Sequence, residues 1–342
     1  AADDSASTTA GSSVSRDADS GVLANDIGHA LTVTDFTAVD AAYGELDIDE
    51  DGSFTLAPAA GFSGVVQYTY EITDLGGNTA SATLTITVRP TADADSGATP
   101  AQTPVEFTAA ELLDGDMGTD LEVTSATDGS HGTVEVDADG NITYTPADDY
   151  SGPDTFTYTV TDASGLTATA IVTVSVTPVT VDDSDSTTAG TAVSRTSDEG
   201  VLSNDLGFGL TVSSFDNVPS EQGTLVIYQS GAYSFTPAPG FSGVVNSTYT
   251  ARDATGQTTT GTLTITVNVV AVNDTATTVA GVSLTRSAGT GVVANDRGTG
   301  LSVTDFDEID EEQGSLSISA SGAYTFVPAT GFSGIVTTTY TV

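Results

Sequence analysis

A strict alternation of apolar and polar residues marks the most regular segments of this chain. Residues 79–88 read TASATLTITV, in which alanine, leucine, isoleucine and valine alternate with threonine and serine. Residues 66–72 alternate in the same way, with valine, two tyrosines and isoleucine on one face. A period of two places alternate side chains on opposite faces, so both segments are predicted to be half-buried β-strands.

Five shorter strands are predicted upstream of these two, at residues 4–8, 14–16, 31–36, 45–48 and 53–56. Asp51-Gly52, between the last two, is a strong hairpin signal because both residues accept left-handed backbone angles. No segment has a helical period of useful length. Seven short strands with turns about every ten residues are typical of an Ig-like β-sandwich.

The same pattern occurs four times along the chain. The Phe-Ser-Gly tripeptide of residues 62–64 returns at 150–152 (as Tyr-Ser-Gly), 241–243 and 332–334. The tyrosines Tyr70, Tyr158, Tyr249 and Tyr340 repeat with the same spacings of 88, 91 and 91 residues. A period of about 90 residues matches the size of one small sandwich domain.

We therefore predict an all-β fold of four tandem Ig-like or cadherin-like β-sandwich domains in an elongated array. The domains are expected at residues 1–89, 90–178, 179–269 and 270–342, and the last one lacks its final strand. Either a longer array continues past this point, or a neighbouring chain donates the missing strand by β-augmentation.

The repeated aromatic residues are expected to be structural. Tyr70 and its three equivalents lie on the apolar face of a strand, so we assign them to the core. Phe62 and its equivalents lie in a loop and are expected to plug one end of each sandwich. Stacking on a sugar is the alternative for these loop residues.

The charge of the chain excludes several classes of partner. There are 47 acidic and 6 basic residues, all of the latter arginine, for a net charge of −41. Nucleic acid and anionic membrane surfaces need basic patches, so neither is expected as a partner. No apolar stretch is long enough to span a membrane, and no cysteine is present for a disulfide. The charge requires salt or bound cations to limit self-repulsion.

Acidic residues are concentrated where one end of each sandwich is expected. If the seven strands alternate in direction, the chain start and the second, fourth and sixth loops share one end. Oxygen ligands gathered there suit a hard divalent cation, so we predict Ca²⁺ sites that stiffen the joints between repeats. The candidate ligands are Asp3, Asp4, Asp26 and Asp74 in the first repeat, Asp93, Asp95, Asp114, Asp116, Asp120 and Asp162 in the second, and Asp182, Asp183, Asp205 and Asp253 in the third. A solvated acidic surface suited to high salt is the alternative.

The linkers between repeats are short, as in Val88-Arg89-Pro90-Thr91. The last strand of each repeat leaves at the end opposite to the acidic one, and this opposite end is nearly neutral. Each acidic end is therefore expected to abut the neutral end of the repeat before it.

Several short motifs of each repeat resemble those of a known group of repeats. Val22-Leu23-Ala24-Asn25-Asp26, Phe62-Ser63-Gly64 and residues 68–74 look like the tandem Ig-like or cadherin-like repeats of large prokaryotic surface proteins and RTX-type adhesins. The resemblance covers the whole chain. It implies a secreted or surface-displayed stalk of stacked sandwiches, often stiffened by calcium, that holds a separate adhesive domain away from the cell.

Catalytic chemistry has little support in the sequence. His29 and His131 lie at non-equivalent positions of their repeats, and cysteine and lysine are absent. No enzymatic activity and no cofactor other than Ca²⁺ are therefore expected. We predict a non-catalytic, extracellular structural region of a cell-surface stalk, adhesin or filament that associates with itself or with neighbouring repeats. A module that binds a surface glycan or protein is the alternative, and it would need an exposed aromatic cluster.

Overall fold

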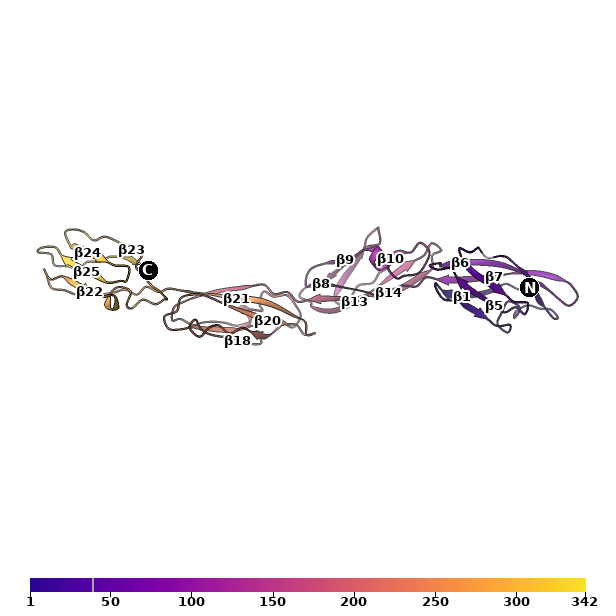
Figure 1. Ribbon diagram of the computed structural model, residues 1–342, viewed down its shortest axis with the longest axis horizontal. Coiled ribbons are helices and arrows are strands. Elements are labelled where there is room, and N and C mark those ends of the chain that lie inside the picture. The colour runs from indigo at the N-terminus through magenta and orange to yellow at the C-terminus, as the bar shows by residue number, and fades with distance from the viewer. Residues whose placement is uncertain (39) are drawn as a thin grey trace. The chain divides into compact units, whose positions relative to one another are not determined.

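The chain forms two compact units, Ala1–Thr177 and Pro178–Val342, and each contains two of the four repeats (Figure 1). The computed structural model describes residues 1–38 and 40–342. Within them, the helical segments are a single-turn helix, α1 (Ala109–Leu112), and two 3₁₀ turns, η1 (Ser197–Glu199) and η2 (Ala288–Thr290). No helix in this part of the chain is long and apolar enough to cross a bilayer. The predicted all-β fold is confirmed.

Repeat 1 forms the seven strands that its alternation predicts. They are β1 (Asp4–Thr9), β2 (Val14–Arg16), β3 (Thr32–Phe36), β4 (Gly44–Ile48), β5 (Phe54–Pro58), β6 (Gly64–Thr73) and β7 (Thr79–Arg89). A four-stranded sheet has the order β1-β7-β6-β3, and a three-stranded sheet has the order β2-β5-β4. Every observed limit lies close to the predicted one, because burial of one face forces the alternation that the sequence displays.

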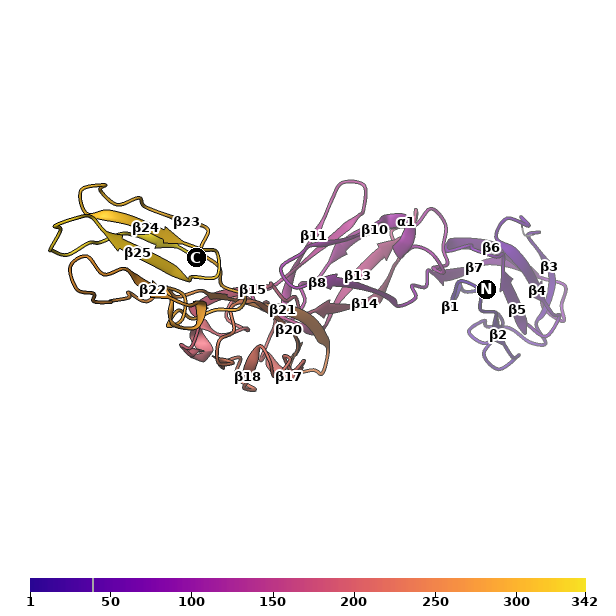
Figure 2. The same ribbon diagram turned by 60° about the vertical axis from the view of Figure 1, so that its left-hand side comes forward.

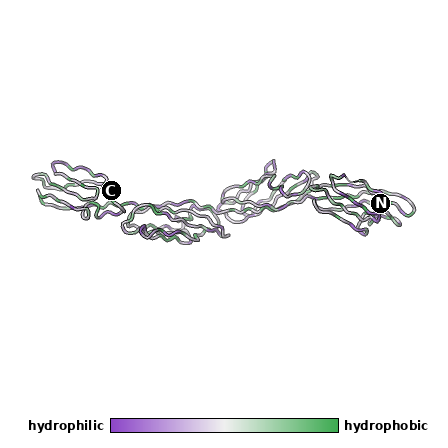
Figure 3. Tube along the Cα trace, viewed as in Figure 1, coloured by the Kyte–Doolittle hydropathy of each residue, from purple (hydrophilic) through white to green (hydrophobic). Residues whose placement is uncertain are grey.

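The core of repeat 1 lies between its two sheets. Successive residues of β6 alternate between buried and exposed, and the hydropathy changes repeatedly along the strands (Figure 3). Tyr70 on β6, Leu84 and Ile86 on β7, and Leu56 on β5 are fully buried. Burial of each such side chain stabilises the fold by about 1.5–3 kcal/mol. Phe62 packs against this core from the loop before β6, as expected.

The strand directions determine which loops share an end of the sandwich. β1 runs parallel to β7, with Asp4 beside Leu84 and Thr8 beside Val88. The other pairs are antiparallel, and consecutive strands alternate in direction. The start of β1 and the loops after β2, β4 and β6 therefore lie at one end, which we call the acidic pole. The loops after β1, β3 and β5 lie at the other end, the neutral pole.

Repeat 2 follows the same plan with one added element. Its strands are β8 (Asp95–Pro100), β9 (Val105–Phe107), β10 (Glu122–Ala126), β11 (Gly132–Val136), β12 (Ile142–Pro146), β13 (Gly152–Thr161) and β14 (Thr167–Thr177). The sheets are β10-β13-β14-β8 and β11-β12-β9. Helix α1, which lies beside β10 in Figure 2, was not predicted. A reciprocal capping box between Thr108 and Glu111 forms it, and the T-x-x-E spacing was the available signal.

Repeat 3 is built like repeat 1. Its strands are β15 (Asp183–Thr188), β16 (Val193–Arg195), β17 (Thr211–Phe215), β18 (Gly223–Ile227), β19 (Tyr233–Pro237), β20 (Gly243–Arg252) and β21 (Thr258–Asn268). The sheets are β15-β21-β20-β17 and β16-β19-β18. Tyr249 and Phe235 are fully buried in its core, and Phe241 packs against it from the Phe-Ser-Gly loop.

Repeat 4 keeps one sheet and a small part of the other. β22 (Leu284–Arg286), β25 (Tyr324–Pro328) and β24 (Gly314–Ile318) form a three-stranded sheet, and β23 (Asp305–Phe306) pairs with β26 (Tyr340–Thr341). Residues 274–279 and 335–339 are outside the strands. In repeat 3 the equivalent residues both pair with β21, and the present sequence has no counterpart of β21 in repeat 4. Tyr340 is accordingly only half-buried.

Candidate site at the acidic poles

Two aspartates and one tyrosine meet at the acidic pole of every repeat, and we call each such group a pole cluster. The first aspartate lies at the start of the repeat, the second ends an Asn-Asp pair or its equivalent, and the tyrosine belongs to the β6-type strand. The four clusters are Asp4, Asp26 and Tyr70; Asp95, Asp116 and Tyr158; Asp183, Asp205 and Tyr249; and Asp274, Asp296 and Tyr340.

The tyrosine hydroxyl lies at the centre of its cluster. Tyr70 Oη is 2.6 Å from Asp4 Oδ2 and 3.1 Å from the carbonyl oxygen of Val22. Tyr249 Oη is 3.0 Å from Asp205 Oδ2. Burial and the adjacent carboxylates raise the pKa of both phenols, so each stays protonated and donates a hydrogen bond. The sequence correctly places these tyrosines in the core, but it gave no indication of the role of the hydroxyl.

A main-chain amide holds the second aspartate of each cluster. In repeat 3, the N–H of Val181 donates to Asp205 Oδ1 at 2.8 Å. The equivalent bonds of 2.5–2.7 Å run from Ala2 to Asp26, from Asp93 to Asp116 and from Val272 to Asp296. Each donor precedes the first strand of its repeat, so the bond fastens the beginning of the repeat to its own pole.

Burial makes the charged form of these carboxylates unfavourable. It raises the pKa of Asp183 to about 6, and the charge of Asp205 adds to the effect. Burial also raises the pKa of Asp205 to about 6, although the bond from Val181 opposes the shift. For the same main reason the pKa is raised at Asp4, Asp95, Asp116 and Asp274. The protein alone therefore compensates the negative charge of the clusters poorly.

Three clusters contain a buried carboxylate oxygen that receives no hydrogen bond. The atoms are Oδ2 of Asp26, Asp95 and Asp183, and none has a partner among the described residues. Buried polar atoms in folded proteins normally have a partner, and a carboxylate oxygen needs a proton donor or a cation. The clusters of repeats 1 to 3 thus have unused capacity for a positively charged ligand.

Repeat 2 gathers the most acidic side chains at its pole. Besides burial, the charges of Asp93 and Asp114 raise the pKa of Asp95. Asp93 and Asp95 likewise act on Asp116. Asp120 adopts a φ of 47° in the following turn. Among the described residues, no three or more His, Asp or Glu side chains are grouped closely enough to hold a metal ion by themselves. A cation bound here would also need main-chain or water oxygens.

Other predicted ligands are bonded elsewhere. The turn aspartates Asp74, Asp162 and Asp253 each accept amides of their own turns, as when Asp74 Oδ1 accepts from Gly76 at 2.8 Å and Asn78 at 2.9 Å. Asp3 and Asp182 accept from the final strand of their repeats, at 2.9 Å from Thr83 and 2.8 Å from Thr262. These bonds engage at least one oxygen of each of the three turn carboxylates within its own turn, and their role as Ca²⁺ ligands stays a prediction.

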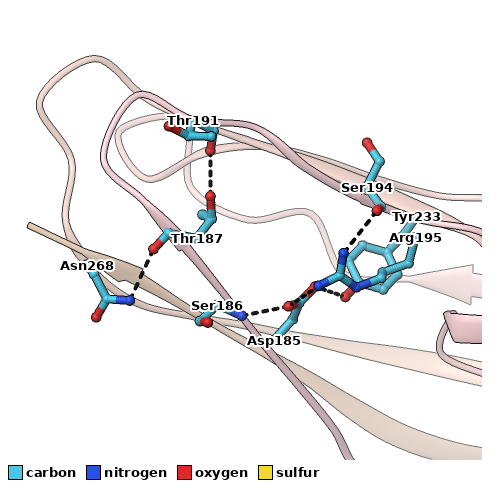
Figure 4. Close-up of polar contacts among 8 residues, drawn as sticks. All are labelled: Asp185, Ser186, Thr187, Thr191, Ser194, Arg195, Tyr233 and Asn268. Atoms are coloured by element: carbon cyan, nitrogen blue, oxygen red, sulfur yellow. Dashed lines mark hydrogen bonds and ion pairs between the residues drawn. The ribbon is translucent and has the colours of Figure 1, made fainter. Parts of the chain in front are cut away.

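Repeat 3 has a further charged contact near its core, which the sequence did not reveal. Arg195 Nη2 lies 2.7 Å from Asp185 Oδ1, and the Tyr233 hydroxyl donates to Asp185 Oδ2 at 2.6 Å (Figure 4). Asp185 belongs to β15, whereas Arg195 and Tyr233 belong to β16 and β19 of the other sheet. The contact therefore connects the two sheets. Ala6 occupies the equivalent position in repeat 1, so that repeat cannot make it.

A serine of the Phe-Ser-Gly motif joins repeats 1 and 2. The Ser63 N–H donates to Thr119 Oγ1 at 3.0 Å, and the Thr119 N–H donates to Ser63 Oγ at 3.0 Å. Ser63 Oγ also donates to Asp162 Oδ2 at 2.7 Å, and both side chains are buried. The neutral pole of repeat 1 thus meets the acidic pole of repeat 2, as the short linkers predict.

Repeats 3 and 4 are joined by the same pair of bonds. The Ser242 N–H donates to Thr299 Oγ1 at 3.0 Å, and the Thr299 N–H donates to Ser242 Oγ at 2.8 Å. We call this reciprocal serine–threonine pairing the joint contact. Its recurrence in both units shows that this serine is an interface residue in repeats 1 and 3, a role that sequence reasoning missed.

The two histidines lie in different repeats and have different surroundings. His131 stacks on Tyr150 with ring centroids 4.1 Å apart. His29 lies in a loop at the acidic pole of repeat 1, where its carbonyl oxygen accepts from Leu75.

A shallow depression of about 300 Å³ on repeat 3 is lined by Val212, Ser213, Ser214, Phe215, Asn217 and Ile227, none of which is an acid or a base near neutral pH.

Paired β-sandwiches, each with a like cluster at one pole and joined in each unit through a serine of the first repeat, define a protein of tandem Ig-like repeats. The family model described as the bacterial Ig domain matches residues 1–87, 88–175, 176–266 and 268–342. The chain belongs to this family and contains four tandem copies of the domain. Such repeats fit an extracellular domain. No curated protein matches the sequence.

Among solved structures, the chain is similar to cadherin ectodomains. The human desmocollin-1 ectodomain is 13% identical with a TM-score of 0.23, over 98% of this chain and 77% of that chain. The protocadherin γB4 extracellular domain is 15% identical with a TM-score of 0.26, over 95% and 59%. An endo-fucoidan hydrolase of glycoside hydrolase family 107 is 15% identical with a TM-score of 0.23 over 77% of this chain, which spans 43% of its length. At such scores these likenesses carry no argument about function.

Proposed function

We propose that the chain is a non-catalytic, extracellular structural region of a cell-surface stalk, adhesin or filament, in which Ig-like sandwiches stack pole to pole. The joint contact supports this function most. It uses a motif that every repeat carries, and it recurs in both units with donor–acceptor distances of 2.8–3.0 Å. Repeats whose neutral pole fits the acidic pole of the next repeat are suited to spacing or assembly.

Small-angle X-ray scattering of the full chain tests the stacking. Four sandwiches in a row should give a distance distribution with a long tail and a shoulder at the spacing of neighbouring repeats. A symmetric distribution with one maximum, as for a compact cluster, would contradict the proposal. The measurement is made at low and at high salt, because charge repulsion alone can extend the chain at low salt. At 1 M salt, repulsion between exposed charges is screened within about 3 Å, so a long tail that persists there reflects stacking.

We further propose that Ca²⁺ neutralises the pole clusters. The orphaned oxygens of Asp26, Asp95 and Asp183 and the raised pKa values of the clusters support this. Calcium binds carboxylate and carbonyl oxygens together with water, so it can complete a site that two carboxylates begin. Repeat 2 is the best candidate, because Asp93 and Asp114 lie near its cluster.

Calorimetric titration of the full chain with CaCl₂ tests this binding. Asp95→Asn should remove the heat that belongs to repeat 2, whereas Asp139→Asn, in the hairpin turn before β12, changes the net charge equally and should leave the heat intact. Equal heats from the two variants would show that calcium does not use the cluster of repeat 2.

Binding of a surface glycan is a second candidate function, and one feature of repeat 2 favours it. The rings of His131 and Tyr150 stack nearly parallel, with 7° between their planes, and His131 is exposed. Aromatic faces of this kind pack on sugar rings. A glycan array probed with the full chain and with His131→Ala tests the idea, and it fails if no glycan is retained or if the variant retains the same ones.

A further inference from the structure

One edge strand of repeat 3 carries no charge, although the chain as a whole is strongly acidic. Strand β18 is the last strand of its sheet, with β19 on one side and no strand of the described chain on the other (Figure 2). We propose that this edge pairs, antiparallel, with β18 of a second copy of the chain. The surface lies on the side of the sandwich and not at its poles, so the proposal goes beyond stacking and does not depend on it.

The outward side chains along this edge differ from one repeat to the next. In repeat 3 they are Thr224, Val226 and Tyr228, of which Val226 is 38% exposed and Tyr228 is 55% exposed. Charged side chains on an edge strand protect it from pairing with a second sheet. Repeats 1 and 2 keep acids at this edge, whereas repeat 3 has an apolar and an aromatic side chain instead. The equivalent positions are Glu45, Asp47 and Asp49 in repeat 1, Thr133, Glu135 and Asp137 in repeat 2, and Ser315, Ser317 and Ser319 in repeat 4.

The facing edge strand of the other sheet, β17, is uncharged as well. It has Ser214 where repeat 1 has Asp35, and Thr211 where repeat 2 has Glu122. The depression of about 300 Å³ lies between the two edges, because four residues of β17 and Ile227 of β18 line it. This side of the sandwich is therefore hollow, and a second strand can approach β18 from it.

The main chain of β18 has free hydrogen-bonding groups on this side. The Tyr228 N–H donates to the carbonyl oxygen of Ala232 at 2.8 Å, which continues the pairing of β18 with β19. Hydrogen-bonded pairs alternate along an antiparallel ladder, so Val226 bonds to β19, whereas the N–H and C=O groups of Leu225 and Ile227 point away from it. These four groups have no hydrogen-bond partner among the described residues. They are available to a strand that adds to the edge.

A second copy of β18 fits these groups in one register. When Leu225 of each copy lies opposite Ile227 of the other, the free groups of the two strands form four main-chain hydrogen bonds. The Val226 side chains of the two copies then face each other in a non-hydrogen-bonded pair, where side chains lie closest. Tyr228 faces Thr224, and an aromatic residue opposite a β-branched one is a stabilising cross-strand pair.

The distribution of charge favours a second copy over a different partner. A basic partner would be attracted to the acidic edges of repeats 1 and 2 rather than to this one. An edge without acids suits an acidic partner, and a second copy is such a partner, with a net charge of −41. In the same register, two copies of repeat 1 would place Asp47 against Asp47 and Glu45 against Asp49. Like charges directly opposite each other are destabilising, so self-pairing is suited to repeat 3 and not to repeat 1.

The remaining charge determines the conditions under which the pairing forms. Asp216 and Glu221 lie between β17 and β18, outside the paired residues. Together with the net charge they make two copies repel each other at low ionic strength. Salt shortens the Debye length from about 10 Å at 0.1 M to about 3 Å at 1 M, and it does not weaken apolar burial. Dimerisation should therefore increase with salt concentration.

Analytical ultracentrifugation of the full chain in 1 M NaCl tests the pairing. The wild type should dimerise, and Val226→Asp should raise the dissociation constant at least about tenfold, because it places two acids opposite each other at the centre of the contact. Val244→Asp is the matched control, since Val244 of β20 is 54% exposed on the other sheet and the net charge changes equally. The proposal is overturned if the wild type stays monomeric, or if the two variants raise the dissociation constant equally.

Hydrogen exchange distinguishes this contact from any other dimer. In 1 M NaCl, a rise in the concentration of the wild type should slow exchange of the Leu225 and Ile227 amides at least about tenfold, because only the dimer gives them acceptors. The amides of Leu46 and Ile48, the equivalents in repeat 1, should exchange at a rate that does not depend on concentration. A dimer in which the Leu225 and Ile227 amides stay unprotected would refute pairing through β18. Stacking within the chain would stand in that case, because the scattering experiment judges it separately.

Discussion

Replacement of Asp183 by asparagine is expected to stabilise repeat 3 at neutral pH when no divalent cation is present. The folded chain raises the pKa of Asp183 from 3.8 to about 6, mainly through burial. A group with a raised folded-state pKa contributes stability that is complete below about pH 4 and lost as the pH rises through 6. At pH 7.5 the wild type therefore keeps Asp183 and Asp205 charged and adjacent, and the substitution removes one of the two charges.

The size of the effect follows from the pKa shift. A rise from 3.8 to about 6 corresponds to about 3 kcal/mol at most, since one pKa unit is worth about 1.4 kcal/mol. Asp183 is only half-buried, so screening by solvent reduces this to about 1–1.5 kcal/mol. For a domain of about 90 residues, such a gain raises Tm by roughly 5–10 °C.

Differential scanning calorimetry in the presence of a chelator, at pH 7.5 and pH 5, measures this gain. The advantage of Asp183→Asn over wild type should be largest at pH 7.5 and should shrink at pH 5, where the wild-type pair takes up protons. Asp198→Asn, in the exposed turn η1, is the matched control for the change in net charge. The reasoning is refuted if Asp183→Asn lowers Tm at pH 7.5, or if its advantage over the control is the same at both pH values.

Three further outcomes are expected. Millimolar Ca²⁺ should raise Tm relative to chelator, and Asp116→Asn should reduce the increase; an unchanged Tm would exclude calcium at the poles. Tyr70→Phe should lower the free energy of unfolding by about 1–3 kcal/mol, because it removes a buried donor to a carboxylate. Tyr68→Phe should be neutral or stabilising, because the Tyr68 hydroxyl is buried and has no partner among the described residues. If Tyr70→Phe and Tyr68→Phe lowered the free energy of unfolding equally, the hydrogen bonds assigned to Tyr70 would be contradicted. Ser63→Ala should speed hydrogen exchange of the Thr119 amide about tenfold, as expected for about 1.4 kcal/mol, and leave the equivalent amide of unit 2 unchanged.

The strands could be predicted because one-sided burial leaves a direct trace in the sequence. Residues 79–88 were expected as a strand and β7 spans Thr79–Arg89. The parallel partner of β1 could not be predicted in this way. The β1 sequence, DSASTT, has a single buried position at Ala6, so its own pattern does not specify the strand with which it pairs. Helix α1 could not be predicted from a helical period either, because the capping box of Thr108 and Glu111 closes a single turn.

The positions of some candidate site residues could be predicted, because the order of the strands determines which loops share a pole. The alternation of strand directions was sufficient to place Asp4 and Asp26 at one pole, because alternate loops lie at the same end of the sandwich. The sequence could not show that Asp74 is bonded within its own turn, or that Ser63 reaches Asp162, 99 residues away in the next repeat. Contacts between side chains so distant in sequence depend on the loop conformations at both poles. Repetition of a serine at a fixed spacing was the available signal for the joint.

The parallel pairing of β1 with β7 has a consequence for a chain under tension. When a repeat is pulled by its two ends, these neighbouring strands are drawn in opposite directions along their shared axis. The main-chain hydrogen bonds across six paired residues, present in repeats 1, 2 and 3, are then loaded in shear and must rupture together. Repeats 1, 2 and 3 should therefore resist extension for as long as these six-residue pairs hold.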